Sequence, residues 1–220
     1  MKNICIKYGI IEDKIDVVPH GYNPDIFKVN KTKTLYDFLF VGGYVGKGDR
    51  KGADLLAKSF VDEFKLKERF ILFKINSAYR QNEKELKLRN DMFIDTADLV
   101  DSEMVEIYES SKVFVNTSMA EGFNMALLEA LACGLPVVTT STGESDYLSD
   151  IADDRIMIIP SCFEIPAKHS LWDFGKWFLP SKEHIQVFMR EALKEKKKKY
   201  DGIERWTWEE AAKKAIRCLE

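Results

Sequence analysis

Short apolar runs alternate with amphipathic segments along most of the chain. This alternation is typical of a parallel sheet whose faces are covered by helices. The apolar runs predict strands at 38–41, 70–75, 92–94, 113–115, 136–139 and 155–159. We therefore predict an α/β fold built on a parallel sheet of about six strands, with helices on both faces.

Apolar residues at helical spacing predict the covering helices. These helices begin near Ala53, after a cap at Asp101 or Ser102, at Met125, near Lys182 and near Trp208. The helix from Met125 should end at Cys133, because the glycine that follows is a normal residue just past a helix C-terminus.

Residues 163–180 break this pattern, because they crowd aromatic residues together with Pro166, Gly175 and Pro180. The aromatic residues are Phe163, Trp172, Phe174, Trp177 and Phe178. Such a stretch is either a surface loop packed on itself or a hydrophobic patch for a partner, and we favour the packed loop. The chain has no internal repeat or low-complexity linker. We therefore expect one domain at 31–220, with a lead-in segment at 1–30 packing on it.

Composition narrows the function classes. A formal net charge of −3 gives no broad reason to expect nucleic-acid binding, and the basic run 194–199 is interpreted as a solvated helix end. No apolar run is long enough for a membrane span and no signal sequence precedes the first strand, so we expect a cytoplasmic protein. The four cysteines form no CxxC pair, and Cys133 and Cys218 are expected to be buried thiols. We predict no metal site and no cofactor.

The candidate site is the buried strand 113–115, the polar turn after it and the helix start at Met125. Ligands bind at the carboxyl ends of strands in open α/β sheets, and the free N–H groups of a helix start bind phosphate. Gly122 removes a side chain where a ligand would approach. Glu121 and Glu129 carry carboxylates, which accept hydrogen bonds from hydroxyl-rich ligands. The alternative is that Glu121 caps the helix and Glu129 is a surface residue.

The stretch 121–138 resembles the E-x7-E signature of retaining, family 4-type glycosyltransferases with the GT-B fold. Two earlier segments of the chain also resemble the family, in the same order along the sequence. Residues 17–27 are similar to the segment that leads into the family's C-terminal domain, and residues 40–56 to its first strand, loop and Lys-Gly helix start. The resemblance implies a single Rossmann-like domain, one half of a GT-B fold, that binds a nucleoside diphosphate sugar as donor.

The resemblance also implies residue roles. Glu121 would contact the hydroxyls of the transferred sugar, Glu129 the ribose, and Lys51 the diphosphate leaving group. The remaining expected contacts to the donor come from Gly42, Gly43, Arg50, Gly122, Phe123, Asn124 and Met125.

The chain departs from the family in two ways. Gly43 stands where the family usually has an arginine, whose charge Arg50 or Lys47 would have to supply. The chain also begins where the family's N-terminal acceptor domain should already have ended. The expected function is therefore the donor domain for retaining transfer to an unknown acceptor, with a missing N-terminal domain or a partner chain. The alternative is a catalytically incomplete nucleotide-sugar-binding module that needs or regulates a partner chain.

Other interpretations are weaker. A dehydrogenase-like dinucleotide binder lacks its GxGxxG after Val41, and a purely structural or interaction protein would use the aromatic segment 163–180. His20 falls in the approach segment and is expected to line the cleft or to be structural. The loop with Asp95 and Thr96 is expected to receive the nucleotide base.

Overall fold

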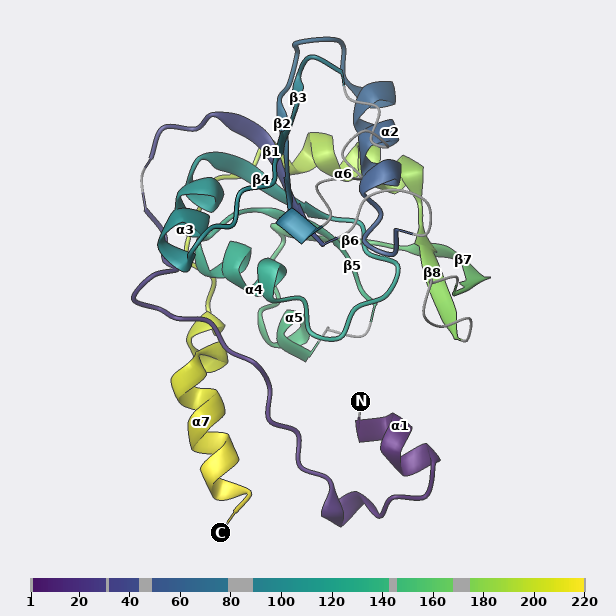
Figure 1. Cartoon of the computed structure of the whole chain (residues 1–220), viewed down its shortest axis with the longest axis vertical. Coiled ribbons are helices and arrows are strands. Elements are labelled where there is room, and N and C mark those ends of the chain that lie inside the picture. The colour runs from purple at the N-terminus through teal and green to yellow at the C-terminus, as the bar shows by residue number, and fades with distance from the viewer. Residues whose placement is uncertain are drawn as a thin grey trace.

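The computed structural model describes residues 2–30, 32–43, 49–78, 89–142, 146–167 and 175–219. Its centre is a sheet of six parallel strands (Figure 1). In chain order the strands are β1 (Tyr36–Gly42), β2 (Ile71–Ile75), β3 (Met92–Asp95), β4 (Ser111–Asn116), β5 (Val137–Thr140) and β6 (Ile156–Ile159). The predicted parallel sheet is confirmed.

The strands lie in the order β3-β2-β1-β4-β5-β6, so the chain moves outward in opposite directions from the central pair. Phe38 of β1 pairs with Ile71 on one side and with Val113 on the other. The order therefore reverses between β1 and β4. The loops that follow these two strands lie next to each other at the carboxyl edge of the sheet, where α/β proteins bind ligands.

One face of the sheet is covered by α2 (Ala53–Glu63) and α6 (Lys182–Ala192), which also pack on each other. Ser181 caps α6, because its hydroxyl accepts from the His184 N–H at 3.2 Å. Phe38, Phe60 and Phe73 are fully buried in this layer. Burial of such rings is the main favourable contribution to folding, about 2–3 kcal/mol for each.

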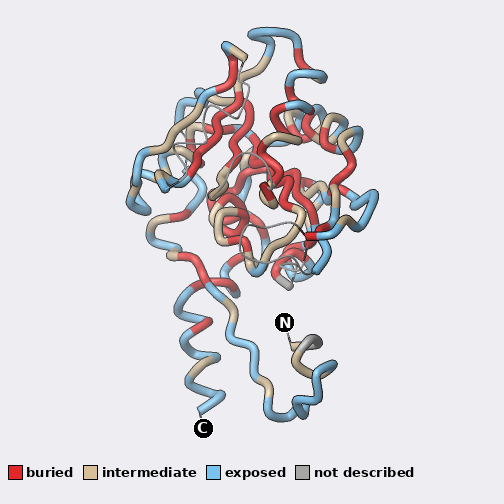
Figure 2. The backbone as a smooth tube through the Cα atoms, turned by 45° about the vertical axis from the view of Figure 1, so that its right-hand side comes forward, coloured by how far each residue is buried: buried red, intermediate tan, exposed pale blue. Residues whose placement is uncertain are grey.

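The opposite face carries α3 (Asp101–Glu109), α4 (Met125–Ala132) and α5 (Asp146–Asp150), with the 3-10 turn η3 (Ile203–Trp206). Tyr108, Leu127 and Tyr147 are fully buried there. Helices thus cover both faces, as expected, and Figure 2 shows the buried backbone concentrated in the sheet between them.

The start of α3 differs from the sequence prediction. The cap residue is Val100 and neither Asp101 nor Ser102, because the Glu103 carboxylate reaches back to accept from the Val100 N–H at 3.0 Å. The other end of α3 is closed by Lys197, whose ammonium donates to the carbonyls of Tyr108 and Glu109. Burial lowers the pKa of Lys197. The basic run 194–199 thus lies just beyond the end of α6. Its other lysines are exposed, as expected, whereas Lys197 is structural.

The aromatic segment 163–180 is a β-hairpin and not a loop. Its strands are β7 (Ser161–Pro166) and β8 (Lys176–Pro180), paired antiparallel. Trp177 is buried, whereas Phe163 is 69% exposed and Phe178 38% exposed. The segment is therefore only partly self-packed. Trp172 and Phe174 lie outside the described residues.

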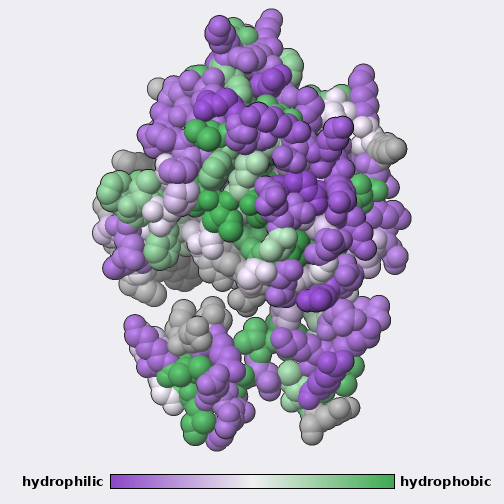
Figure 3. Space-filling model, turned by 180° about the vertical axis from the view of Figure 1, so that it is seen from behind, coloured by the Kyte–Doolittle hydropathy of each residue, from purple (hydrophilic) through white to green (hydrophobic). Residues whose placement is uncertain are grey.

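The two terminal segments extend from the same end of the molecule. The lead-in carries α1 (Lys2–Lys7) and the short turn η1 (Glu12–Lys14), and α7 (Trp208–Arg217) ends the chain. In Figure 3 these segments form two lobes below the body. Residues 7–14 are exposed, and the lead-in packs on the domain through Tyr22 and Phe27, which are buried. The division at residue 30 stays a prediction.

Within the described residues, no helix is sufficiently long and apolar to cross a membrane, and no three metal-binding side chains come together. Cys133 is buried as expected, and burial raises the pKa of its thiol to about 12. Cys218 is exposed near the end of α7, so the prediction that it is buried was wrong.

Candidate functional site

The candidate site forms where the loops after β1 and β4 meet. The Thr117 hydroxyl donates to the Gly52 carbonyl at 2.9 Å, and the Met119 N–H donates to the Arg50 carbonyl at 2.7 Å. Gly52 makes this contact possible. Its φ is +76°, and a Cβ there would lie 2.4 Å from the Thr117 carbonyl oxygen. Only glycine lets the two loops approach so closely.

A buried aspartate fixes the turn that carries the cations. The Asp49 carboxylate accepts from the N–H groups of Lys51 at 2.8 Å and Ala53 at 2.6 Å, at the start of α2. Burial raises the pKa of Asp49 to about 7, although both hydrogen bonds oppose the rise. Sequence reasoning assigned Asp49 no role. An aspartate just before a predicted helix start, where such residues accept from backbone N–H groups, was the available signal.

Glu121 lies at the centre of the site, and its side chain is only 4% exposed. Its carboxylate forms an ion pair with Lys51, accepts from Arg50 at 3.2 Å, and accepts from the Ser118 hydroxyl at 2.7 Å. Burial alone would raise the pKa of Glu121, but the neighbouring Lys51 outweighs it, so the pKa lies below its usual value. The structure thus brings together Glu121, Lys51 and Arg50, three of the predicted site residues.

The N-terminus of α4 lies directly after this loop. Its cap is Asn124, with φ +60° and a side chain that accepts from the Leu127 N–H at 3.4 Å. The alternative that Glu121 caps this helix is therefore wrong. Within the described part of the chain, the N–H groups of Met125 and Ala126 have no acceptor. Such groups, with the positive end of the helix dipole, suit an anion.

Gly122 and Phe123 are neighbours in the chain but lie in different surroundings. Gly122 is exposed, and a Cβ there would meet nothing within 4 Å, so folding does not require a glycine. The Phe123 ring packs in an aromatic cluster, with ring centroids 5.2 Å from His20 and from Tyr147. His20 also contacts the Trp208 ring at 5.6 Å. These contacts make His20 a structural residue, which is one of the two roles expected from the sequence.

Glu129 occupies a separate, half-buried environment on α4. Its carboxylate accepts from the hydroxyl of Tyr108, on α3, at 2.8 Å. Burial raises the pKa of Glu129 to about 7, with a smaller contribution from Asp101, while the Tyr108 hydrogen bond opposes the rise. The alternative of a simple surface residue is therefore wrong, and sequence reasoning missed Tyr108. No contact joins Glu129 to Glu121 among the described residues.

The remaining predicted residues lie around the end of β1. A Cβ on Gly42 would come within 2.5 Å of the Phe40 ring, so packing alone accounts for this glycine. Gly43 follows the strand, and Arg50 brings a positive charge into the site from the loop. Lys47 lies outside the described residues. Asp95, expected near the base, lies at the end of β3 with the Lys74 ammonium 3.8 Å from its carboxylate.

Comparisons with known proteins agree with this architecture. The family model for glycosyl transferases group 1 matches residues 36–162. A probable sucrose-phosphate synthase from Thermosipho melanesiensis is 27% identical over 97% of this chain and 49% of its own length. A D-inositol 3-phosphate glycosyltransferase from Paenarthrobacter aurescens is 32% identical over 62% of this chain and 37% of its own length. The chain thus spans half or less of the length of these relatives.

Solved structures show the same fold at low sequence identity. The C-terminal domain of a group 1 family glycosyl transferase from Francisella tularensis superposes with a TM-score of 0.58 at 13% identity, covering 91% of this chain and 99% of that domain. The Anabaena protein HepE, in complex with UDP and glucose, gives a TM-score of 0.63 at 12% identity over 99% of this chain and 60% of its own. The fold is therefore one Rossmann-like half of a GT-B fold. The chain belongs to the glycosyl transferases group 1 family.

Proposed function

We propose that this chain binds a nucleoside diphosphate sugar beside Glu121 and forms the donor half of a retaining glycosyltransferase. The observation that carries the proposal is the cluster of Lys51, Arg50 and Ser118 around the Glu121 carboxylate, next to the first turn of α4. Two cations and free N–H groups suit a diphosphate, and a carboxylate suits sugar hydroxyls. The UDP and glucose bound to the similarly folded HepE support this class of ligand.

In this proposal Lys51 and Glu121 act together. A lysine ammonium has three N–H donors, so Lys51 can donate to Glu121 and to a phosphate oxygen at once. As the bond between sugar and phosphate breaks, negative charge grows on the departing diphosphate, and Lys51 and Arg50 stabilise it. Glu121 stays ionised because these cations hold its pKa low, and it accepts hydrogen bonds from the sugar. Retention of configuration is carried over from the family resemblance.

Glu129 is proposed to accept hydrogen bonds from the ribose. One of its carboxylate oxygens is already bound to Tyr108, and its pKa of about 7 means that it is partly protonated near neutral pH. Hydroxyl donors favour the ionised form, so nucleotide binding should release a proton from Glu129.

The first test is calorimetric titration with UDP, GDP and their common sugar conjugates. Lys51→Gln should weaken binding of the diphosphate by about tenfold or more, because it removes a charge-assisted hydrogen bond. The matched control is Lys58→Gln, which removes the same charge from an exposed position of α2 and should leave affinity unchanged. Saturable binding that is equal in the parent and Lys51→Gln would overturn the site, as would no binding of any nucleotide.

Sugar transfer also requires an acceptor site, and the chain matches only 49% of the length of its Thermosipho relative. We therefore propose transfer only in combination with an acceptor-binding domain, in the same protein or in a partner chain. An assay of sugar transfer with and without candidate partner chains separates an enzyme from a module that only binds donor. Donor binding without transfer under either condition would favour the binding module.

A further inference from the structure

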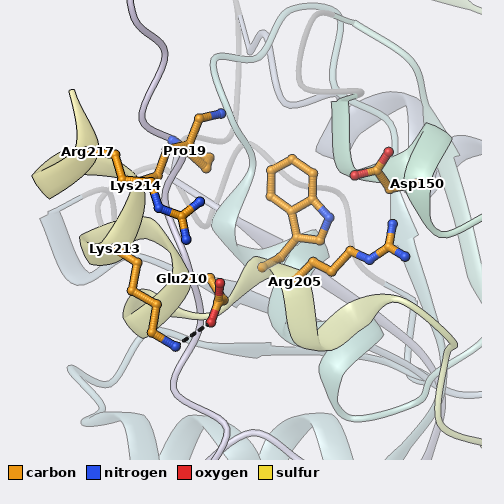
Figure 4. A pocket seen from close by; sticks show the side chains of 8 residues that line it. Pro19, Asp150, Arg205, Glu210, Lys213, Lys214 and Arg217 are labelled. Atoms are coloured by element: carbon orange, nitrogen blue, oxygen red, sulfur yellow. Dashed lines mark hydrogen bonds and ion pairs between the residues drawn. The ribbon is translucent and has the colours of Figure 1, made fainter.

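Four segments of the chain surround a hollow at the base of α7 (Figure 4). Pro19 comes from the lead-in, Asp150 from the end of α5, and Arg205 and Trp206 from η3, while one face of α7 forms the remaining wall. The hollow has a volume of about 300 Å³. This is at the lower end of the range for sites that bind small molecules.

Positive charges converge on this hollow. From α7 it is lined by Glu210, Lys213, Lys214 and Arg217, whose spacing of three, four and seven residues places them on one helix face. Lys213 is neutralised by Glu210 at 2.7 Å. Lys214, Arg217 and Arg205 have no carboxylate within ion-pair distance in the described part of the chain. Three cations without an ion-pair partner among the described residues thus line one hollow, in a protein whose formal net charge is −3.

An unsatisfied polar group lies in the same wall. Trp206 is only 9% exposed, and its indole N–H is buried without a hydrogen-bond partner among the described residues. A buried N–H without an acceptor is unfavourable, so the wall lacks an acceptor for this N–H, and its two carboxylates do not balance its four cations.

A neighbouring hollow has no such excess of positive charge, so the excess is particular to the hollow beside Trp206. It has a volume of about 520 Å³, and its charged lining residues are Lys28, Lys199, Lys213, Glu204, Glu209 and Glu210. Its lysines and glutamates are equal in number. Lys199 lies 3.7 Å from Glu204, and Lys213 lies 2.7 Å from Glu209. The charges that line that hollow are balanced, so it offers no excess positive charge to an anion.

We infer that the hollow between Trp206 and α7 is a binding site for the phosphate group of a phosphomonoester. Such a group carries a charge of about −1.5 to −2 at pH 7 and three strong acceptor oxygens. Among the described residues, the three cations of the hollow and the Asp150 carboxylate have no ion-pair partner, which leaves two positive charges in excess. Arginine also binds phosphate through two parallel N–H donors. The phosphate comes from a soluble phosphorylated metabolite or from a lipid headgroup, and both sources offer the same chemistry.

Stabilisation of the helix end does not account for the whole site. Lysine and arginine in the last turn of a helix interact favourably with its dipole, which explains Lys214 and Arg217. Arg205 precedes α7, however, and the helix dipole gives no reason for a buried indole N–H beside it. A role in helix stability alone would lower the melting temperature when the cations are removed, without any response to phosphate.

The test follows the indole N–H signals of the ¹⁵N-labelled protein by NMR during titration with inorganic phosphate and then glycerol 1-phosphate. The Trp206 signal is assigned from its loss in Trp206→Phe. We expect a saturable shift of this signal. The triple variant Arg205→Gln, Lys214→Gln, Arg217→Gln should weaken binding by about tenfold or more, since three charge-assisted contacts are lost. All three positions are exposed, so the variant should fold.

The matched control replaces three other exposed lysines, Lys33, Lys58 and Lys65, by glutamine and should bind as the parent does. Sedimentation with phosphatidylcholine vesicles, with and without phosphatidic acid, tests the lipid source. Binding to phosphatidic acid vesicles alone, lost in the triple variant, would assign the site to a headgroup. Loss of binding that is equal in the triple and control variants would overturn the inference, as would no response to any of the probes.

Discussion

The two ends of the signature segment carry the same side chain in opposite electrostatic environments. At the loop end, Glu121 is nearly enclosed and meets Lys51 and Arg50, and its pKa is lowered. At the helix end, Glu129 is half-buried and meets only the neutral hydroxyl of Tyr108, and its pKa is raised to about 7. Both carboxylates are removed from water, but among the described residues only Glu121 gains a positive charge beside it.

The difference shows that the charge state of each carboxylate depends on the side chains that the fold places next to it. Both residues are glutamates, so the residue type does not decide it. The cations reach Glu121 because β1 and β4 are adjacent strands whose loops meet. Glu129 points instead to α3, which offers a phenol. In the proposed function, the carboxylate beside the sugar therefore stays ionised, whereas the carboxylate beside the ribose titrates near neutral pH.

The largest expected effect comes from breaking the loop end itself with Gly52→Ala. The positive φ and the clash with the Thr117 carbonyl should lower the free energy of unfolding by about 2–4 kcal/mol. The shift would also move Lys51 away from Glu121. Urea unfolding measures the change. An unchanged midpoint would show that the loops can separate without cost.

Gly122→Ala is the matched control for this variant, because a Cβ there meets nothing within 4 Å. We expect its stability to change by no more than about 0.5 kcal/mol. If the ligand approaches this backbone as proposed, the same methyl group should weaken donor binding in calorimetry.

Glu121→Gln should give the next largest loss, about 2–3 kcal/mol at pH 7, because the partly buried cations lose their counter-charge. The pKa of Glu121 is lowered from 4.5, so its stabilisation is present above pH 4.5 and is lost as the pH falls further. The gap between parent and variant in urea unfolding should therefore shrink in acid. A gap that does not depend on pH would mean that charge is not its source.

Glu129→Gln should act in the opposite sense. The folded protein holds the Glu129 proton up to a pH of about 7, and the unfolded chain releases it near 4.5, so parent stability falls between these values. The variant should thus gain about 1–2 kcal/mol relative to the parent between pH 5 and pH 8, after allowance for partial exposure. Asp49 titrates in the same window in both proteins and cancels. Parallel stability profiles in urea would contradict the assignment.

Tyr108→Phe is the smallest change, because it removes one hydroxyl from a fully buried ring. The expected loss is about 1 kcal/mol. Since the hydroxyl favours the ionised carboxylate, the pKa of Glu129 should rise further without it. An NMR titration of the Glu129 side-chain carboxyl measures this shift, with Glu129→Gln identifying the signal.

Local patterns predicted most of the fold. The strands and the helix starts at Lys182 and Trp208 were predicted from apolar periodicity, and the structure shows these two helices capped by Ser181 and Thr207. The hairpin of β7 and β8 was missed because Pro166, Gly175 and Pro180 are residues typical of loops, while the ladder that defines the hairpin pairs its two strands with each other. The cap of α3 was missed because Glu103 supplies it from inside the helix.

The sequence named candidate residues for the site but did not predict the contacts between them. The signature resemblance named Glu121, Glu129 and Lys51. The pairing of Glu121 with Lys51, seventy positions away in the chain, depends on the order of strands, which no local pattern specifies. The titration behaviour of Glu129 depends on a tyrosine from another helix for the same reason.

Backbone hydrogen bonds join the lead-in to the start of the C-terminal helix. The Tyr22 N–H donates to the Trp206 carbonyl at 3.0 Å, and the Trp208 N–H donates to the Tyr22 carbonyl at 3.1 Å. Gly21 lies so close that a Cβ would sit 2.3 Å from the Thr207 backbone. A force applied to either terminal segment therefore loads these two hydrogen bonds together with the ring contact between His20 and Trp208. Because the Trp206 and Phe123 rings are in contact, that load reaches the loop that carries Glu121.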